Sequence, residues 1–499
     1  MSTTSPIIEI REGITANPDY RMEAPVNLRI EQGEQIAIAG NNAAGKSRLV
    51  DILTGRHALI GNAIHYNFSL STLPLVSDNI KYIAFRDSYG EHDNSYFLQQ
   101  RWNQMEIDDD MPTVGSLLDK TLSLRGASPE CIALRDRLCC LFGIDALLDR
   151  SIISLSSGEL RKFQLIRTLL NMPRVVIIDN PYIGLDASTR KELTCVLRQL
   201  TQTLSLLFIL VVSSSCDIPD FITHVIPVED LHVLPKQTRA QYLQTHSTES
   251  LPHSIAVEKL MQQIPFKDLS SIPFYPREGG TILKLQDITV RYGSHTLLHH
   301  LNWTVDEGER WALYGKNGSG KSTLLSLICA DNPQGYACDI ELFGHKRGSG
   351  ESIWDIKRHI GYVSPEMHRA YRTDIPAVSI VASGFYDTVG LYTRPRPEEM
   401  DICLKWMEIF GIRHLAERTF LRLSSGEQRL CLLARAFVKD PELLILDEPL
   451  HGLDASRRAL VRDVIEAFCL RPHKTLIMVS HYLEELPPCI NHRLFLKKD

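Results

Sequence analysis

The octapeptide GNNAAGKS spans residues 40–47, and a second octapeptide of the same pattern, GKNGSGKS, spans residues 315–322. Each follows a short apolar run, at residues 35–39 and 311–314, and each precedes a helical pattern of apolar residues. In a strand–loop–helix of this kind the glycines let backbone N–H groups curl around phosphate oxygens, and the start of the helix adds partial positive charge. The sequence therefore predicts two phosphate-binding loops, each within an α/β fold.

In each predicted loop a lysine, Lys46 or Lys321, balances the charge of the β and γ phosphates, and the serine after it, Ser47 or Ser322, is expected to ligate Mg²⁺. The expected phosphate-contacting residues are Gly40, Asn41, Asn42, Ala43, Ala44, Gly45, Lys46 and Ser47 in the first loop, and Gly315, Lys316, Asn317, Gly318, Ser319, Gly320, Lys321, Ser322 and Thr323 in the second.

The two loops belong to a longer internal repeat. Three further blocks recur in the same order at an offset of 268 residues: LSSGE (155–159 and 423–427), an apolar run ending in aspartate (175–179 and 443–447) and GLDA (184–187 and 452–455). The interval from the phosphate loop to LSSGE is seven residues longer in the first half. We therefore predict two duplicated domains, at residues 1–240 and 281–499, joined by a connector at 241–280 with one short helix at 255–263.

The composition is that of a globular protein without a membrane span. Apolar residues make up 44% of the 499 residues, and the longest apolar run, Leu206–Val212, is far shorter than the roughly 18 to 20 residues that cross a bilayer. The start, MSTTSPIIEIREG, does not have the pattern of a signal peptide, so a cytoplasmic location is expected. The formal charge of -6 argues against a broad nucleic-acid-binding surface, although it is compatible with a local basic groove. Most of the eleven cysteines, which form no CxxC pair, are expected to be buried apolar residues.

Two other blocks carry candidate site residues. Asp179 and Asp447 end predicted buried parallel strands, so each places a carboxylate at the carboxyl edge of its sheet, where it is expected to hold Mg²⁺ through the metal's water shell. LSSGE opens an amphipathic helix, and small residues at a helix start suit an anion, so the candidate γ-phosphate contacts are Ser156, Gly158, Ser424 and Gly426. LSSGE also fits an N-cap serine with a capping-box glutamate. Its recurrence 24 residues before each aspartate favours the phosphate contact.

Together these blocks resemble the ATP-binding cassette (ABC) ATPases over nearly the whole chain: GxxxxGKS stands for the Walker A motif, LSSGE for the signature, the strand-end aspartate for Walker B and GLD for the D-loop. The resemblance implies ATP and Mg²⁺ as cofactors and hydrolysis of ATP to ADP and phosphate. It also implies an α/β fold of two tandem P-loop, RecA-like nucleotide-binding domains, each with an antiparallel β-subdomain and a helical signature subdomain.

The same resemblance implies intramolecular head-to-tail pairing of the cassettes, with each ATP between the Walker motifs of one and the signature of the other. The halves differ at two catalytic positions of the family: Glu448 and His481 match its general base and switch histidine, whereas the first half has Asn180 and either Ser213 or Ser214. Asparagine does not accept a proton. The expected result is one hydrolytic site, in the second cassette, and one site that mainly binds ATP; neutral drift of the first half is the alternative.

Tyr292 stands where the family stacks an aromatic ring on adenine, although a tyrosine on a strand face is the alternative.

A finer resemblance concerns the cellular role. Residues 331–364 resemble the ModF/PhrA group of tandem ABC proteins, which is named for molybdate transport. The resemblance implies two fused cassettes without a transmembrane portion. The leading interpretation is an ATPase that energises or regulates a membrane transporter, with molybdate or a related oxyanion as the candidate cargo, peripheral on the inner face of the cell membrane and with an integral membrane permease as its partner. The alternatives are an ABC ATPase acting on nucleic acid or ribosomes and a nucleotide-dependent regulatory protein.

Overall fold

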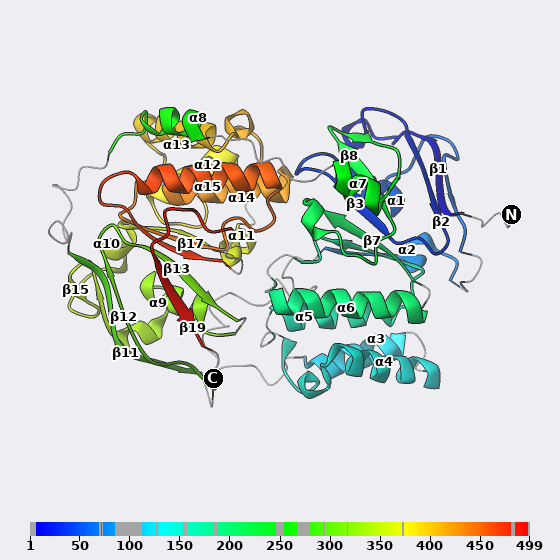
Figure 1. Ribbon diagram of the computed structural model, residues 1–499, viewed down its shortest axis with the longest axis horizontal. Coiled ribbons are helices and arrows are strands. Elements are labelled where there is room, and N and C mark those ends of the chain that lie inside the picture. Colours follow the sequence, from blue (N-terminus) through cyan, green and yellow to red (C-terminus); the bar gives the residue numbers. More distant parts are fainter. Residues whose placement is uncertain are drawn as a thin grey trace. The chain divides into compact units, whose positions relative to one another are not determined.

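The computed structural model describes residues 6–68, 71, 73–84, 112–124, 128–152, 155, 157–182, 185, 187–204, 206–245, 254–266, 280–292, 295–316, 318–371, 374–480 and 485–497. The chain divides into two units, Met1–Glu249 and Ser250–Asp499. Each unit contains a mainly parallel sheet, a smaller antiparallel sheet and a group of helices (Figure 1). The predicted domain and connector limits differ slightly from this division and stay predictions.

In the first unit, the larger sheet has the strand order β10-β8-β3-β7-β6-β5, with β9 paired to β8. Its five central strands are parallel, and β9 and β10 are antiparallel additions at one side. The smaller sheet, β2-β1-β4, is antiparallel. The strands are β1 Pro6–Gly13, β2 Val26–Glu31, β3 Ile36–Ala39, β4 Ile64–Tyr66, β5 Ile80–Ala84, β6 Val175–Asp179, β7 Leu207–Val212, β8 His224–Glu229, β9 His232–Val233 and β10 Gln237–Thr238.

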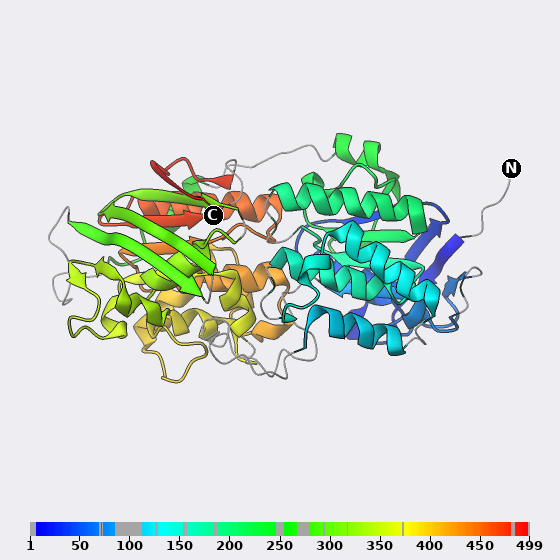
Figure 2. The same ribbon diagram turned by 90° about the horizontal axis from the view of Figure 1, so that it is seen from below.

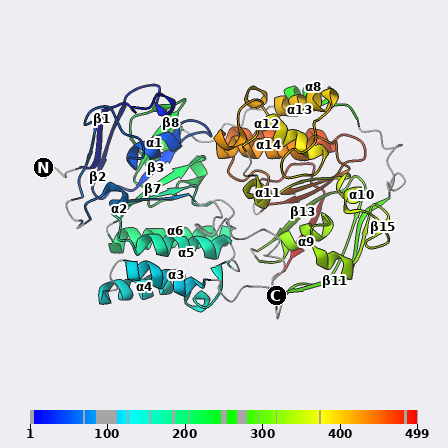
Figure 3. The ribbon, with the colours of Figure 1, turned by 180° about the vertical axis from the view of Figure 1, so that it is seen from behind.

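The helices of this unit include a group that follows β5 in sequence. Helices α3, α4 and α5 contact one another, and Figures 1 and 3 show α5 beside α6. The helices are α1 Lys46–Leu53, α2 Val76–Asn79, α3 Val114–Leu124, α4 Pro129–Phe142, α5 Ser157–Leu169, α6 Ala187–Leu204 and α7 Arg239–Thr245.

In the second unit, a parallel sheet of order β16-β17-β18-β13-β19 is accompanied by the antiparallel sheet β12-β11-β14-β15. Figure 2 shows the long strands β11 and β12 side by side, in green. The strands are β11 Thr281–Tyr292, β12 His295–Asp306, β13 Arg310–Gly315, β14 Asp339–Leu342, β15 His345–Lys346, β16 Ile360–Val363, β17 Leu443–Asp447, β18 Thr475–Val479 and β19 His492–Leu496.

The helices of the second unit are α8 Ser254–Met261, α9 Lys321–Ile328, α10 Ile353–Lys357, α11 Pro365–Ala370, α12 Ala377–Ala382, α13 Pro397–Ile409, α14 Ser425–Phe437 and α15 Ala455–Cys469. Helix α8, which falls in the predicted connector, contacts α13 and α15 (Figure 1). Its Val257 and Met261, with Ile264 beyond its end, are buried in the same apolar cluster as Trp406 of α13. This part of the connector is therefore included in the core of the second unit.

The central strands are apolar on both faces because both faces are covered. In β6, Val176 and Ile178 belong to one apolar cluster, which includes residues of α3 to α6, whereas Val175 and Ile177 belong to another, which includes residues of β1, β2 and α1. Alternate side chains of a strand point to opposite faces, so β6 lies between two covering layers. This arrangement, with an antiparallel sheet and a helical group in each unit, confirms the predicted α/β fold class.

The structure also bears on two expectations that came from the composition. In the described part of the chain, no helix combines the length and the apolar character that a membrane span requires. Six of the eleven cysteines are buried: Cys131, Cys139, Cys329, Cys403, Cys431 and Cys469. Burial raises the pKa of Cys403 to about 12, so this thiol remains protonated at neutral pH.

Candidate functional site

In the first unit the predicted phosphate loop connects β3 to α1. The ammonium group of Lys46 turns back over the loop and donates to the carbonyl oxygens of Gly40 at 2.7 Å and Asn41 at 2.8 Å. Ser47, the second residue of α1, is exposed. The loop, the lysine and the serine hydroxyl are thus brought together at the start of one helix.

The second loop has the same construction between β13 and α9. Lys321 donates to the carbonyl oxygens of Gly315 at 2.6 Å and Lys316 at 3.0 Å, and Ser322 is exposed in the first turn of α9. Thr323, also predicted as a contact, is buried, and Asn317 lies outside the described residues. Because two distant segments fold alike around their lysines, the local sequence specifies this geometry.

Glycine is required at two kinds of position in these loops. A Cβ atom on Gly40 would stand 2.0 Å from the carbonyl oxygen of Val228, and one on Gly315 would stand 2.6 Å from that of Leu496. Gly45 and Gly320, the N-cap residues of α1 and α9, have left-handed backbone with φ of 106° and 87°. Neither supplies a capping side chain, and uncapped N–H groups at a helix start suit an anion.

The loops differ in detail. Ala43 adopts φ of 66° where the second loop has Gly318 with φ of 79°, and a left-handed alanine costs roughly 1 to 2 kcal/mol. In the second loop, the hydroxyl of Ser319 is buried and has no hydrogen-bond partner among the described residues. A buried polar atom without a partner in an anion-binding loop suits a bound phosphate oxygen.

The two strand-end aspartates lie at the carboxyl ends of β6 and β17, as predicted. In the first unit, Asp179 accepts hydrogen bonds from Tyr82 Oη at 2.9 Å and from the side-chain amide of Asn180 at 2.9 Å. In the second unit, Asp447 is buried, with 7% exposure. In both units the carboxylate and the loop serine are hard oxygen donors of the kind that Mg²⁺ prefers, so these residues fit the metal.

The next residue is Asn180 in one unit and Glu448 in the other, and their backbones match. Asn180 has φ of 49° and donates its N–H to Val211 O at 2.9 Å; Glu448 has φ of 50° and donates to Val479 O at 3.0 Å. The strand registers also correspond, since Asp179 pairs with Val211 and Asp447 with Val479. In the first unit, an amide side chain therefore occupies the backbone position at which the second unit has a carboxylate.

The Glu448 side chain has a defined partner. Its Oε2 lies 2.8 Å from Nδ1 of His451. Its main-chain carbonyl accepts a short hydrogen bond from the guanidinium of Arg429 on α14, which also contacts Pro449 O at 3.3 Å. Burial lowers the pKa of Arg429, and the charges of Glu448 and Asp447 oppose that shift. Glu448 is thus held through both its backbone and its side chain.

The signature segment of the second unit contains a capping box. Ser424 caps α14, and its hydroxyl and N–H both donate to Glu427 Oε2, at 2.7 and 2.8 Å. The N-cap interpretation of LSSGE is therefore realised here, whereas the phosphate contact stays a prediction. Gly426 and Gly158 are buried in the first turns of α14 and α5, and Ser156 lies outside the described residues.

Besides Asn317 and Ser156, two further predicted residues are left untested by the geometry. His481 lies outside the described residues, and only the backbone of Tyr292 is described, at the end of β11. The strand register places Ser213, rather than Ser214, at the position that matches His481, two residues beyond Val211. Ser213 Oγ donates to Asn42 Oδ1 of the phosphate loop at 2.9 Å, so the substituted position still reaches that loop.

Sequence reasoning missed three residues near the site: Tyr82, Tyr362 and His451. Tyr82 and Tyr362 occupy the same register in the strands beside β6 and β17, and this repeated tyrosine was an available signal. His451 lies within the repeated block that ends in GLDA, but its position in the first half is Ile183, so the repeat pattern did not select it.

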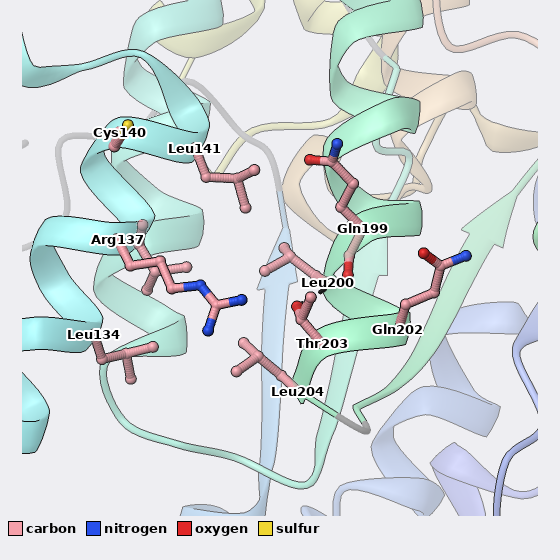
Figure 4. A pocket seen from close by; sticks show the side chains of 10 residues that line it. Leu134, Arg137, Cys140, Leu141, Gln199, Leu200, Gln202, Thr203 and Leu204 are labelled. Atoms are coloured by element: carbon pink, nitrogen blue, oxygen red, sulfur yellow. Dashed lines mark hydrogen bonds between the residues drawn. The ribbon is translucent and has the colours of Figure 1, made fainter.

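A cavity of about 470 Å³ in the first unit lies away from these motifs (Figure 4). It lies between α4 and α6, and half of the residues that line it are leucines, among them Leu134, Leu141 and Leu204, with Arg137 at its side. None of the predicted nucleotide-contacting residues lines it. The cavity is therefore separate from the candidate nucleotide site.

Comparison with known proteins agrees with the motifs. A family model described as "ABC transporter" matches residues 24–183 and again residues 298–451. The ABC transporter ATP-binding protein ModF of Escherichia coli K12 is 35% identical over 488 residues, which cover 98% of this chain and 96% of that protein. An uncharacterized ABC transporter ATP-binding protein of Schizosaccharomyces pombe is 28% identical over 94% of this chain and 93% of its own length.

Solved structures are similar in fold. The archaeal ribosome recycling factor aABCE1, solved with the stalk protein aP1, has a TM-score of 0.52 and 17% identity, covering 93% of this chain and 83% of that one. A structure of RNase-L Inhibitor has a TM-score of 0.51 and 17% identity at the same coverage. At this identity the similarity shows only a common fold.

Proposed function

This chain belongs to the ABC transporter family and contains two ATP-binding cassettes, and from that premise we propose that it is an asymmetric ATPase. The second cassette hydrolyses ATP, and the first mainly binds it. The observation that carries the proposal is the matched backbone of Glu448 and Asn180, which places a carboxylate in one cassette and an amide in the other at the same point of the fold.

The chemistry follows from the residues around the second loop. Lys321 and the N–H groups at the start of α9 bind the phosphates, and Ser322 with Asp447 would hold Mg²⁺, which supplies charge neutralisation when bound. Glu448 accepts the proton of the attacking water, because a carboxylate is a base and its position follows the buried Asp447. In the first cassette, the Asn180 amide donates to Asp179 and has no basic atom to take a proton.

The test is Glu448→Gln, which keeps the size of the side chain and removes the base. We expect steady-state hydrolysis to fall by about 10² to 10⁴ fold, while the affinity for ATP changes little. Glu398→Gln, an exposed residue in the first turn of α13, is the matched control and should keep wild-type turnover. Substantial hydrolysis by Glu448→Gln would refute the assignment of the base.

From the family resemblance we further propose that the cassettes work as a head-to-tail pair, in which Ser156 and Gly158 serve the ATP held by Lys321, and Ser424 and Gly426 serve the ATP held by Lys46. Gly158→Asp should then lower the kcat of the second cassette while ATP binding at Lys321 persists. Unchanged turnover would argue against this pairing.

As the cellular role we propose that ATP hydrolysis energises or regulates a membrane transporter through an integral permease at the cytoplasmic face, with molybdate or a related oxyanion as the candidate cargo. The support is the 35% identity to a protein named as a transporter ATP-binding protein. Affinity purification from detergent-solubilised membranes should retain a multi-span protein. Recovery of the protein with ribosomes in sucrose gradients would instead favour the alternative, an ATPase that acts on ribosomes. The net charge of -6 argues against this alternative, because binding to nucleic acid usually requires an excess of Lys and Arg.

A further inference from the structure

The pair formed by Glu448 and His451 lies in the second cassette, directly after the strand-end aspartate. Nδ1 of His451 is 2.8 Å from Oε2 of Glu448, and the side chains are 20% and 15% exposed. The His451 N–H also donates to the main-chain oxygen of Glu448, at 3.3 Å. The backbone turn between the two residues is therefore closed by a bond that does not involve the imidazole.

The direction of the side-chain bond follows from its atoms. An ionised carboxylate only accepts hydrogen bonds, so the imidazole donates from Nδ1–H. A free glutamate side chain has three rotatable bonds, and one donor on Oε2 restricts them to conformations that keep the other oxygen, Oε1, in a fixed direction. The imidazole thus orients the carboxylate, while Arg429 and the left-handed φ of 50° fix its backbone.

The first cassette provides an internal comparison. At the same offset of 268 residues, Glu448 is replaced by Asn180 and His451 by Ile183. Four of the surrounding residues are the same, since Pro449, Gly452, Leu453 and Asp454 correspond to Pro181, Gly184, Leu185 and Asp186, and one differs, since Leu450 corresponds to Tyr182. An imidazole that served only the turn would be equally useful in both halves. It is present only in the half that has the carboxylate.

We propose that His451 is a positioning residue for the catalytic base: its Nδ1–H holds the Glu448 carboxylate in the orientation that accepts the proton of the attacking water. The proposal rests on the proposed function, since it requires Glu448 to be the base. The proposal assigns His451 no contact with ATP. Removal of the imidazole should therefore reduce kcat and leave the KM for ATP nearly unchanged.

The test compares two amides at one position. The side-chain nitrogen of asparagine lies at the same distance from Cα as Nδ1 of histidine, whereas that of glutamine lies farther out, near the place of Nε2. His451→Asn should therefore keep kcat within about threefold of wild type, and His451→Gln and His451→Leu should lower it by about tenfold. His414→Leu, which removes an exposed histidine of the same unit, is the matched control and should be unaffected.

The measurements are kcat and KM for ATP, with thermal melting and ATP-analogue affinity to show that each variant is folded and binds nucleotide. The proposal is overturned by a wild-type kcat in His451→Gln, by an increase in kcat, by equal losses in the asparagine and glutamine variants, or by a loss expressed only in KM. If Glu448→Gln itself keeps its hydrolysis, the proposed function fails first, so the two failures are distinguishable.

Discussion

At the scale of single residues, Asn180 has the backbone geometry of Glu448, the proposed base, with an amide in place of the carboxylate. We predict that Asn180→Glu, made in the Glu448→Gln background, raises the rate of ATP hydrolysis about tenfold above that background but leaves it well below the wild-type rate. General-base catalysis usually contributes a rate enhancement of roughly 10² to 10⁴ fold, and a newly introduced carboxylate supplies only part of it. The rest is missing because Ile183 and Ser213 stand where the second cassette has His451 and His481. Single-turnover phosphate release measures the effect. An unchanged rate would show that Asn180 does not limit the first site.

At the scale of elements, helix α8 packs against the rest of the second unit through apolar side chains. The segment that follows it is held by Arg471, which donates to Pro265 O at 3.0 Å. We predict that Met261→Ala lowers the free energy of unfolding of this unit by about 2 to 4 kcal/mol, the usual cost of emptying a buried methionine site. Glu258→Ala, on the exposed side of the same helix, should change it by less than about 0.5 kcal/mol. Denaturant unfolding followed by the fluorescence of the buried Trp406 measures both. Equal denaturation midpoints for the two variants would indicate that the packing of α8 does not stabilise the second unit.

At the scale of the whole chain, two phosphate loops of the same construction should bind two nucleotides. In the Glu448→Gln background, equilibrium dialysis with labelled ATP should give about two ATP per chain, and adding either Lys46→Ala or Lys321→Ala should give about one, because each lysine neutralises the phosphates of its own loop. Retention of two ATP by the Lys46→Ala variant would show that the first loop does not need its lysine. A stoichiometry of one before any lysine is changed would refute a binding role for the first cassette.

The sequence by itself determined the features that depend on short stretches of chain. The phosphate loops, the strand-end positions of Asp179 and Asp447, the duplication and the α/β class follow from local spacing and apolar patterns, and the structure has them where they were predicted. A glycine-rich loop between a strand and a helix is specified by its own residues, because steric limits on φ and ψ act between near neighbours.

Only the tertiary structure decided how side chains from separate segments meet. The contact of Tyr82 with Asp179, the hydrogen bond of Ser213 to Asn42 and the packing of α8 in the second unit each join residues far apart in sequence. The pairing of His451 with Glu448 joins near neighbours, and it occurs at a left-handed residue directly after the end of β17. Strand register and side-chain direction are set by the packing of the whole core, which local patterns do not encode.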